Sequence, residues 1–318
     1  MFPDVCRAVA RLARAYHMHR SGRFAFLALL MSAVPAWGGT TPRAPSFIAS
    51  DHEDASGCGV SVLDAGGNAV DAIVATALCA GVVQPAGSGL GGGGFAVVRS
   101  PGGEVMTLDF REIAPAAATR HMFHDEEGEV RRGAANVGGL AVATPSESRG
   151  LAALLDRWGT QTPRQVARPA IRLASRGFRA GPHLLKALAR ESSEAVQREL
   201  AVGGEPAVPG DLIRRPALAR TLRRWAQSAG EDLHTGRGAD AIVAAVQEAG
   251  GVLTAEDLAD YAVVDRAPVT VSFRNHTIVS MGPPSSGGLL LAQMLRVLDG
   301  VDLSERHAAS TLHRLVET

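Results

Sequence analysis

Apolar positions along the chain recur with the spacing of helices in several segments. The first segment predicts a helix, with apolar side chains three or four residues apart at Val70, Ile73, Val74, Ala77 and Leu78. Asn68 and Asp71 precede and open this segment with the spacing of a capping box, and Pro85 ends it. Comparable spacing predicts further helices at 151–158, 164–176, 216–229 and 239–249, a short one after Thr254, and one that ends at Leu298.

Alternating apolar and polar positions predict two hairpins. The first joins strands at 95–99 and 104–111 through a Ser-Pro-Gly-Gly turn, and the second joins 269–273 to 277–281. In the second strand, Asp109 and Arg111 share a face and project away from the more apolar side. Helices mixed with antiparallel strands favour a layered α+β architecture.

The N-terminal segment has the pattern of an export signal. Basic residues precede an apolar run at 24–33, and small residues for cleavage follow before residue 39. The run is shorter than the roughly 20 apolar residues that a membrane-spanning helix needs, so a membrane anchor is the less favoured alternative. We therefore expect an exported protein, periplasmic or extracellular, with its signal at 1–38, no membrane span and one further domain at 39–318.

Composition limits the remaining classes of function. The chain has 318 residues and is 46% hydrophobic, which is enough for a large core. Lys+Arg and Asp+Glu both number 32, so nothing in the charge favours binding to nucleic acid or to an anionic membrane surface. Arginine pairs such as Arg214-Arg215 are expected at the solvated surface.

Cysteine and histidine offer little for a metal site. Cys58 and Cys79 remain after the leader, and the sequence leaves open whether they form a disulfide or whether Cys79 is a buried free thiol. His121 and His124 lie beside an acidic run, where solvated loop polarity is favoured over a turn of metal ligands. We expect no metal and no cofactor.

The glycine-rich loop at 87–94 satisfies the spacing of a dinucleotide-binding fingerprint. A near-continuous run of glycine fits that pattern by accident, however. The loop also follows a predicted helix and precedes a predicted strand, whereas the fingerprint requires strand, loop and helix in that order. Nucleotide binding is therefore disfavoured, and close packing beside a pocket is the preferred interpretation of these glycines.

Several motifs, taken in order, resemble the gamma-glutamyltransferase family (glutathione hydrolases). The motifs are Gly66-Gly67-Asn68-Ala69-Val70-Asp71-Ala72, Gly89-Leu90-Gly91-Gly92-Gly93-Gly94-Phe95, Leu108-Asp109-Phe110-Arg111-Glu112, Thr254-Ala255-Glu256-Asp257-Leu258 and Pro283-Pro284-Ser285-Ser286-Gly287-Gly288. The resemblance implies a four-layer N-terminal-nucleophile hydrolase fold and an exported precursor that cuts itself into two subunits. It also implies an enzyme that moves the γ-glutamyl group of compounds such as glutathione to water, amino acids or peptides through an acyl-threonine.

The resemblance assigns Arg111 to the α-carboxylate of the glutamyl group. The alternative for Arg111 is a structural salt bridge with Asp109 or Glu112. Gly91, Gly92, Gly93 and Asp109 are expected to shape the pocket. Ser285 and Ser286 are interpreted as a turn that caps the next helix, because no Gly-x-Ser-x-Gly surrounds them.

The family's Thr-Thr-His processing site has no counterpart here, because Thr40-Thr41 precedes a proline within the export region. We therefore expect a large-subunit segment, truncated in a helix that starts at Ser304, with no catalytic residue of its own and with the small subunit as its missing partner. The fold would then be incomplete and this chain inactive alone. The alternatives are a non-catalytic exported binding protein that keeps the fold fragment, and a relative with cephalosporin-acylase-like specificity.

Overall fold

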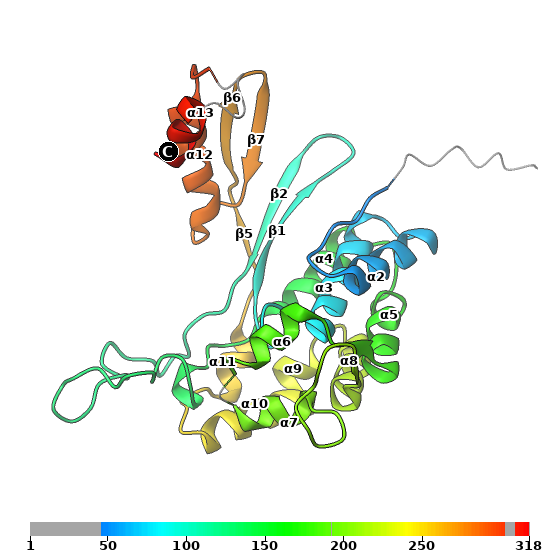
Figure 1. Ribbon diagram of the computed structural model, residues 1–318. Helices are drawn as coiled ribbons and strands as arrows, with labels where there is room; N and C mark the ends of the chain where they lie inside the picture. Colours follow the sequence, from blue (N-terminus) through cyan, green and yellow to red (C-terminus); the bar gives the residue numbers. More distant parts are fainter. Residues whose placement is uncertain (1–45, 192, 303–308, 318) are drawn as a thin grey trace, which may run out of the picture. The chain divides into compact units, whose positions relative to one another are not determined.

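The computed structural model describes residues 46–191, 193–302 and 309–317, and the chain divides into two compact units, Met1–Ser46 and Phe47–Thr318. The export signal expected at 1–38 lies outside the described residues. Of the helix expected from Ser304, the described part is α13 (Ala309–Val316). All the helices and strands described belong to the second unit (Figure 1).

Helices make up most of the regular structure in the second unit. Their bounds are α2 (Glu53–Asp64), α3 (Ala69–Val83), α4 (Glu147–Trp158), α5 (Pro163–Arg176), α6 (Pro182–Leu188), α7 (Glu194–Leu200), α8 (Pro216–Ser228), α9 (Asp232–Thr235), α10 (Arg237–Glu248), α11 (Ala255–Asp260), α12 (Ser286–Leu298) and α13, with a 3-10 turn η1 (Gly139–Ala141). The helices predicted from apolar spacing are confirmed as α3, α4, α5, α8, α10, α11 and α12.

The strands within the described residues form small antiparallel sheets. Their bounds are β1 (Gly94–Arg99), β2 (Val105–Phe110), β3 (Phe178–Arg179), β4 (Leu212–Ile213), β5 (Val264–Arg266), β6 (Val269–Phe273) and β7 (His276–Ser280). β1 and β2 form the first predicted hairpin, with Gly94 opposite Phe110, and β6 and β7 form the second. β5 pairs with the other edge of β2, so β2 is the central strand of the β1-β2-β5 sheet (Figure 1).

α3 lies at the centre of the main core. The predicted capping box is present, because the Asn68 side chain accepts the Asp71 N–H and the Asp71 carboxylate accepts the Asn68 N–H. α2, α4 and α5 pack against the helix. Its fully buried side chains include Val74, Ala75, Cys79, Val82 and Val83. Burial of each valine contributes on the order of 2 kcal/mol to folding, so packing rather than amphipathicity holds this helix.

Asp71 ties α3 to the loop between α4 and α5. The side chain is fully buried, and its carboxylate accepts the Thr160 hydroxyl at 2.6 Å and the Gln161 N–H at 3.1 Å. Burial opposes ionisation, but the hydrogen bonds from Thr160, Asn68 and Gln161 outweigh it and lower the pKa of Asp71. The glycine-rich motif around Asp71 thus contributes an ionised anchor as well as a helix start.

In α8, Leu222 and Trp225 belong to the core and are at most 1% exposed. The indole N–H of Trp225 donates to the Ser148 carbonyl at 3.1 Å. Arg215 corrects the expectation of a solvated arginine pair, because it is buried. Its guanidinium donates to the Gly81 and Val82 carbonyls at 2.8 and 3.0 Å, where the end of α3 leaves carbonyls without helical partners.

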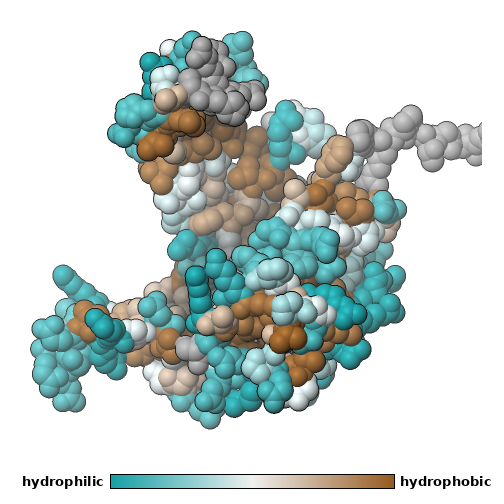
Figure 2. Space-filling view, viewed as in Figure 1, coloured by the Kyte–Doolittle hydropathy of each residue, from teal (hydrophilic) through white to brown (hydrophobic). Residues whose placement is uncertain are grey.

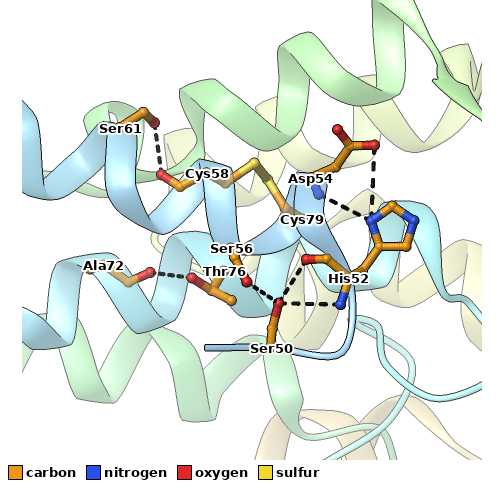
Figure 3. The surroundings of a disulfide bond; sticks show 9 residues. All are labelled: Ser50, His52, Asp54, Ser56, Cys58, Ser61, Ala72, Thr76 and Cys79. Carbon is orange, nitrogen blue, oxygen red and sulfur yellow. Dashed lines mark hydrogen bonds and ion pairs between the residues drawn. A yellow bond between two sulfur atoms is a disulfide. The ribbon is translucent and has the colours of Figure 1, made fainter. Parts of the chain in front are cut away.

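The structure contains a disulfide between Cys58 in α2 and Cys79 in α3 (Figure 3). Both cysteines belong to the main hydrophobic core. The bond decides between the two alternatives that the sequence left open, and it is consistent with an oxidising compartment. It joins two helices that are adjacent in sequence and packed against each other.

α12 packs on the β6–β7 hairpin and exposes apolar side chains on its outer surface. The exposed residues are Leu289, Leu290, Leu291, Met294 and Val297, and Figure 2 shows apolar side chains gathered over this helix. Ser285 occupies the N-cap position, but its side chain makes no capping hydrogen bond, so the predicted turn is present without the cap. No helix in the described part of the chain combines the length and apolar character that crossing a membrane requires.

Candidate functional site

Arg111 lies directly after β2, and its side chain is exposed. Its main chain is held on both sides: the N–H donates to Asp109 Oδ1 at 2.9 Å, and the carbonyl accepts the Tyr261 hydroxyl at 2.9 Å. Among the described residues, no side chain or carbonyl pairs with the Arg111 guanidinium. A fork of free N–H donors on a fixed main chain suits a planar carboxylate.

Asp109 forms its ion pair with Arg266 of β5 and not with Arg111. The carboxylate is 5% exposed, and its Oδ2 accepts from Arg266 Nε at 3.0 Å and Nη2 at 2.9 Å. Its other oxygen accepts the Arg111 N–H. Because Arg266 neutralises Asp109, the charge of Arg111 is left available, and the salt-bridge alternative for Arg111 with Asp109 is wrong in this structure.

The glycine-rich loop is held by the first residues of α4. The Gly92 carbonyl accepts the N–H groups of Ser146 and Glu147 at 2.9 and 2.8 Å, and the Gly89 N–H donates to Glu147 Oε2 at 3.3 Å. The Ser146 hydroxyl also donates to the Phe110 carbonyl at 2.5 Å. The start of α4 therefore fixes both the loop and the end of β2, next to Arg111.

Of the three glycines expected to shape the pocket, Gly93 is the most closely packed. A Cβ on Gly93 would contact the Ser146 hydroxyl and would lie 2.5 Å from the Phe110 carbonyl oxygen. At Gly92 the nearest atom would be the Gly89 carbonyl oxygen at 3.3 Å, and at Gly91 nothing lies within 4 Å. Glycine is thus sterically required at Gly93 and not at Gly91.

Glu147 is a buried carboxyl, 6% exposed, beside this loop. Burial raises its pKa to about 7; the Gly89 N–H opposes this shift, and the nearby charge of Glu112 adds to it. Within the described chain, Oε1 has no hydrogen-bond partner. At neutral pH the carboxyl therefore divides between its protonated and ionised forms.

The structure brings some of the predicted site residues together and separates others. Asp109 and Arg111 lie at the end of β2, where the Arg111 N–H donates to Asp109, and Gly93 packs against the Phe110 carbonyl that accepts the Ser146 hydroxyl. Gly91 instead lines a cavity of about 490 Å³ together with Gly89, Glu147 and apolar residues of α3, α8 and α10. Arg111 is not among the residues that line this cavity.

A metal site is not found in the ranges that the structure describes, where no three His, Cys, Asp or Glu side chains are grouped for one ion. His121 and His124 contact each other edge to face, with ring centroids 5.1 Å apart. This geometry is a ring contact between two residues of the same loop.

Sequence reasoning missed Ser146, Glu147 and Tyr261. A Ser-Glu pair at the start of a helix is typical of ordinary first-turn polarity, so nothing marked Glu147 as buried. Tyr261 follows the predicted short helix α11, but its contact with Arg111 spans 150 residues of sequence. The sequence offers one weak signal that Tyr261 has a special role, which is that the whole chain has only two tyrosines.

Comparisons with known proteins agree with this fold. The gamma-glutamyltranspeptidase family model matches residues 55–318. The glutathione hydrolase proenzyme of Pseudomonas sp. (strain A14) is 36% identical over 279 residues, which cover 85% of this chain and 48% of the relative. The corresponding proenzyme of Escherichia coli (strain K12) is 37% identical over 265 residues, covering 81% and 46%. The chain therefore spans about half the length of the curated relatives it matches.

Among solved structures, the gamma-glutamyltranspeptidase of Helicobacter pylori superposes with a TM-score of 0.81 and 37% identity, covering 86% of this chain and 80% of that one. The architecture is accordingly that of the α+β N-terminal-nucleophile hydrolases. Within that class, the chain belongs to the gamma-glutamyltranspeptidase family.

Proposed function

We propose that this chain supplies the donor-carboxylate site of an exported enzyme that cleaves γ-glutamyl amides such as glutathione. The observation that carries the proposal is Arg111, an exposed guanidinium without an ion-pair partner among the described residues, on a main chain fixed by Asp109 and Tyr261. Two charge-assisted hydrogen bonds from this fork would hold the α-carboxylate and orient the γ-carbonyl for attack. Gly93 packs against the end of β2, and Asp109 accepts the Arg111 N–H, so both residues help to fix the main chain that carries the guanidinium.

The nucleophile of the proposed reaction is a threonine of the partner small subunit. Its hydroxyl oxygen attacks the γ-carbonyl, and its own amine takes the hydroxyl proton and passes it to the departing amine. Water or the amine of an amino acid or peptide then displaces the threonine from the ester. The printed 318 residues include no Thr-Thr-His sequence, so we expect no turnover by this polypeptide alone. Release of nitroaniline from γ-glutamyl-p-nitroanilide by the purified chain would contradict that expectation.

We call the Arg111 guanidinium in this carboxylate-binding role the carboxylate clamp. The direct test of the clamp is to compare ligand binding by the chain with ligand binding by its Arg111→Ala variant. Equilibrium dialysis with γ-glutamyl-p-nitroanilide is compared with dialysis of 4-aminobutanoyl-p-nitroanilide, which differs only by the missing α-carboxylate. Loss of two charge-assisted hydrogen bonds predicts at least about a hundredfold weaker binding of the γ-glutamyl compound, since each is worth roughly 1.5–3 kcal/mol. Binding of the decarboxylated compound should be unaffected.

Arg132→Ala is the matched control, because Arg132 is another exposed loop arginine and has the same charge. If Arg132→Ala weakens binding as much as Arg111→Ala, the effect is one of net charge and the assignment of Arg111 fails. Equal affinity of the unsubstituted chain for both compounds would likewise refute a carboxylate clamp.

A further inference from the structure

Arg111 is exposed, yet its carbonyl is tied to a residue in a distant part of the sequence. The Tyr261 side chain is buried, at 4% exposure for the residue, and its hydroxyl reaches the Arg111 carbonyl oxygen at 2.9 Å. A second contact joins the same two segments, because the Ala116 N–H donates to Asp257 Oδ1 at 2.7 Å. The segment that follows β2 is therefore attached to α11 and to the residue immediately after it.

Arg149 of α4 holds Tyr261 in turn. Its Nη1 donates to the Tyr261 carbonyl at 2.5 Å and to the Ala259 carbonyl at 2.8 Å, which are carbonyls at the end of α11. The other side of the guanidinium pairs with Glu231, at 3.2 Å from Nε and 2.9 Å from Nη2. A planar fork with five donors is pre-organised to bridge the two partners at once, whereas the compact ammonium of a lysine is not.

The surroundings keep Tyr261 a hydrogen-bond donor. Burial raises the pKa of the Tyr261 phenol, and the charges of Asp109 and Glu112 raise it further, while a hydrogen bond with Ser146 acts in the opposite direction. The phenol thus stays protonated across the neutral range. The ring also lies beside His234, with centroids 6.1 Å apart, and His234 Nδ1 is 2.9 Å from the Leu258 carbonyl.

We propose that Tyr261 is a positioning residue for the carboxylate clamp, with Arg149 holding Tyr261 in place, so that the direction of the Arg111 side chain depends on α4 and α11. The proposal rests on the function proposed for Arg111. Arg111 is exposed at the end of a strand, and within the described ranges no hydrogen bond or ion pair of its guanidinium fixes the direction of the side chain. The alignment of the guanidinium with a ligand therefore depends on the hydrogen bonds of the Arg111 main chain.

The experiment combines two readouts on the whole 318-residue chain. Amide hydrogen exchange, measured peptide by peptide, reports whether the 110–113 segment is loosened. Dialysis with the two nitroanilides reports whether the affinity for the α-carboxylate falls. For Tyr261→Phe we expect faster exchange in that segment and about five- to tenfold weaker binding of γ-glutamyl-p-nitroanilide. Affinity for the decarboxylated nitroanilide should stay unchanged.

Thr76→Val is the matched control, because it also deletes one buried hydroxyl that donates to a main-chain carbonyl, at 2.9 Å, but within α3. If Tyr261→Phe does not fold, Arg149→Lys serves as the second variant, since it keeps the charge beside Glu231 and loses the fork that holds Tyr261. Loosening of the 110–113 segment by Arg149→Lys supports the proposal as well.

Exchange of the 110–113 segment that is no faster in Tyr261→Phe or Arg149→Lys than in Thr76→Val overturns the positioning role, whatever the binding data show. Faster exchange with unchanged affinity for both nitroanilides also overturns it, because the clamp then does not depend on Tyr261. If the unsubstituted chain itself makes no distinction between the nitroanilides, the function proposed for Arg111 fails separately. The exchange data then still decide whether Tyr261 fixes the main chain of Arg111.

Discussion

Replacing Glu147 by glutamine should change how the stability of this chain depends on pH. Glu147 is buried beside the glycine loop, with one oxygen accepting the Gly89 N–H and the other without a partner in the described chain. Glutamine has nearly the same shape, and its carbonyl oxygen can still accept from Gly89. The substitution therefore removes the titration of this site while keeping its volume and its main hydrogen bond.

The magnitude follows from the pKa of Glu147, which burial raises from 4.5 to about 7. The folded state binds this proton more tightly than the unfolded state, so the contribution to stability is fully present below pH 4.5 and is lost as the pH rises through 7. At about 1.4 kcal/mol for each tenfold change in proton affinity, the full loss is roughly 3 kcal/mol. Between pH 5 and pH 8 it amounts to about 2 kcal/mol.

The assay is urea unfolding at equilibrium between pH 5 and pH 8, with the disulfide kept oxidised. The measured quantity is the free energy of unfolding of Glu147→Gln minus that of the unsubstituted chain. This difference should rise by about 2 kcal/mol from pH 5 to pH 8. A constant offset is expected as well, because the new amide N–H₂ has no acceptor in place, but that offset is the same at every pH.

Glu248→Gln is the control, since Glu248 is exposed at the end of α10. Its difference curve should stay flat, because folding leaves the Glu248 side chain in contact with solvent. Parallel pH profiles for Glu147→Gln and the unsubstituted chain would refute the reasoning. So would a difference that falls with pH, which would mean that the ionised carboxylate is the form that the fold prefers.

Two further changes have definite expected outcomes. The double substitution Cys58→Ala with Cys79→Ala opens a loop whose ends are 21 residues apart, so the free energy of unfolding measured in urea should fall by roughly 3 kcal/mol. An unchanged value would show that the disulfide does not stabilise the packing of α2 on α3. Gly93→Ala should lower the melting temperature and speed hydrogen exchange in the 110–113 segment, because a Cβ at Gly93 meets backbone atoms. Gly91→Ala should leave both quantities unchanged, because a Cβ at Gly91 meets open space. Equal effects at the two positions would contradict this prediction.

The elements that the sequence predicted are those whose pattern is local. The helix α3 was recognisable because its apolar spacing and its Asn68–Asp71 capping box lie within one segment. The β1–β2 hairpin was recognisable from alternation around a Ser-Pro-Gly-Gly turn. The position of Arg111 at the end of β2 followed directly, and the family resemblance supplied the role that we propose for it.

Other elements could not be predicted because they depend on contacts across the chain. α2 contains Gly57 and Gly59, which lower helix propensity, yet a Cβ on Gly59 would lie 3.1 Å from the Ala72 carbonyl oxygen of α3. The helix therefore forms where it can pack closely on α3 and join it through the disulfide. β5 has three exposed residues and no apolar pattern; its pairing with β2 is accompanied by the ion pair between Arg266 and Asp109.

Asp71 and Glu147 show why the chemistry of buried carboxyls escapes sequence analysis. Both are acidic residues in the first turn of a helix, and their neighbours along the chain do not show that either carboxyl is buried. Burial acts to raise both pKa values. At Asp71 the Thr160 hydroxyl and several N–H groups outweigh burial, so its pKa falls, while at Glu147 only the Gly89 N–H opposes burial and the charge of Glu112 adds to it, so its pKa rises. The number of donors that tertiary packing brings to each carboxyl decides the direction. The same reasoning applies to Arg111. Tertiary packing places Arg266 beside Asp109, so Asp109 pairs with Arg266 and the charge of Arg111 stays available.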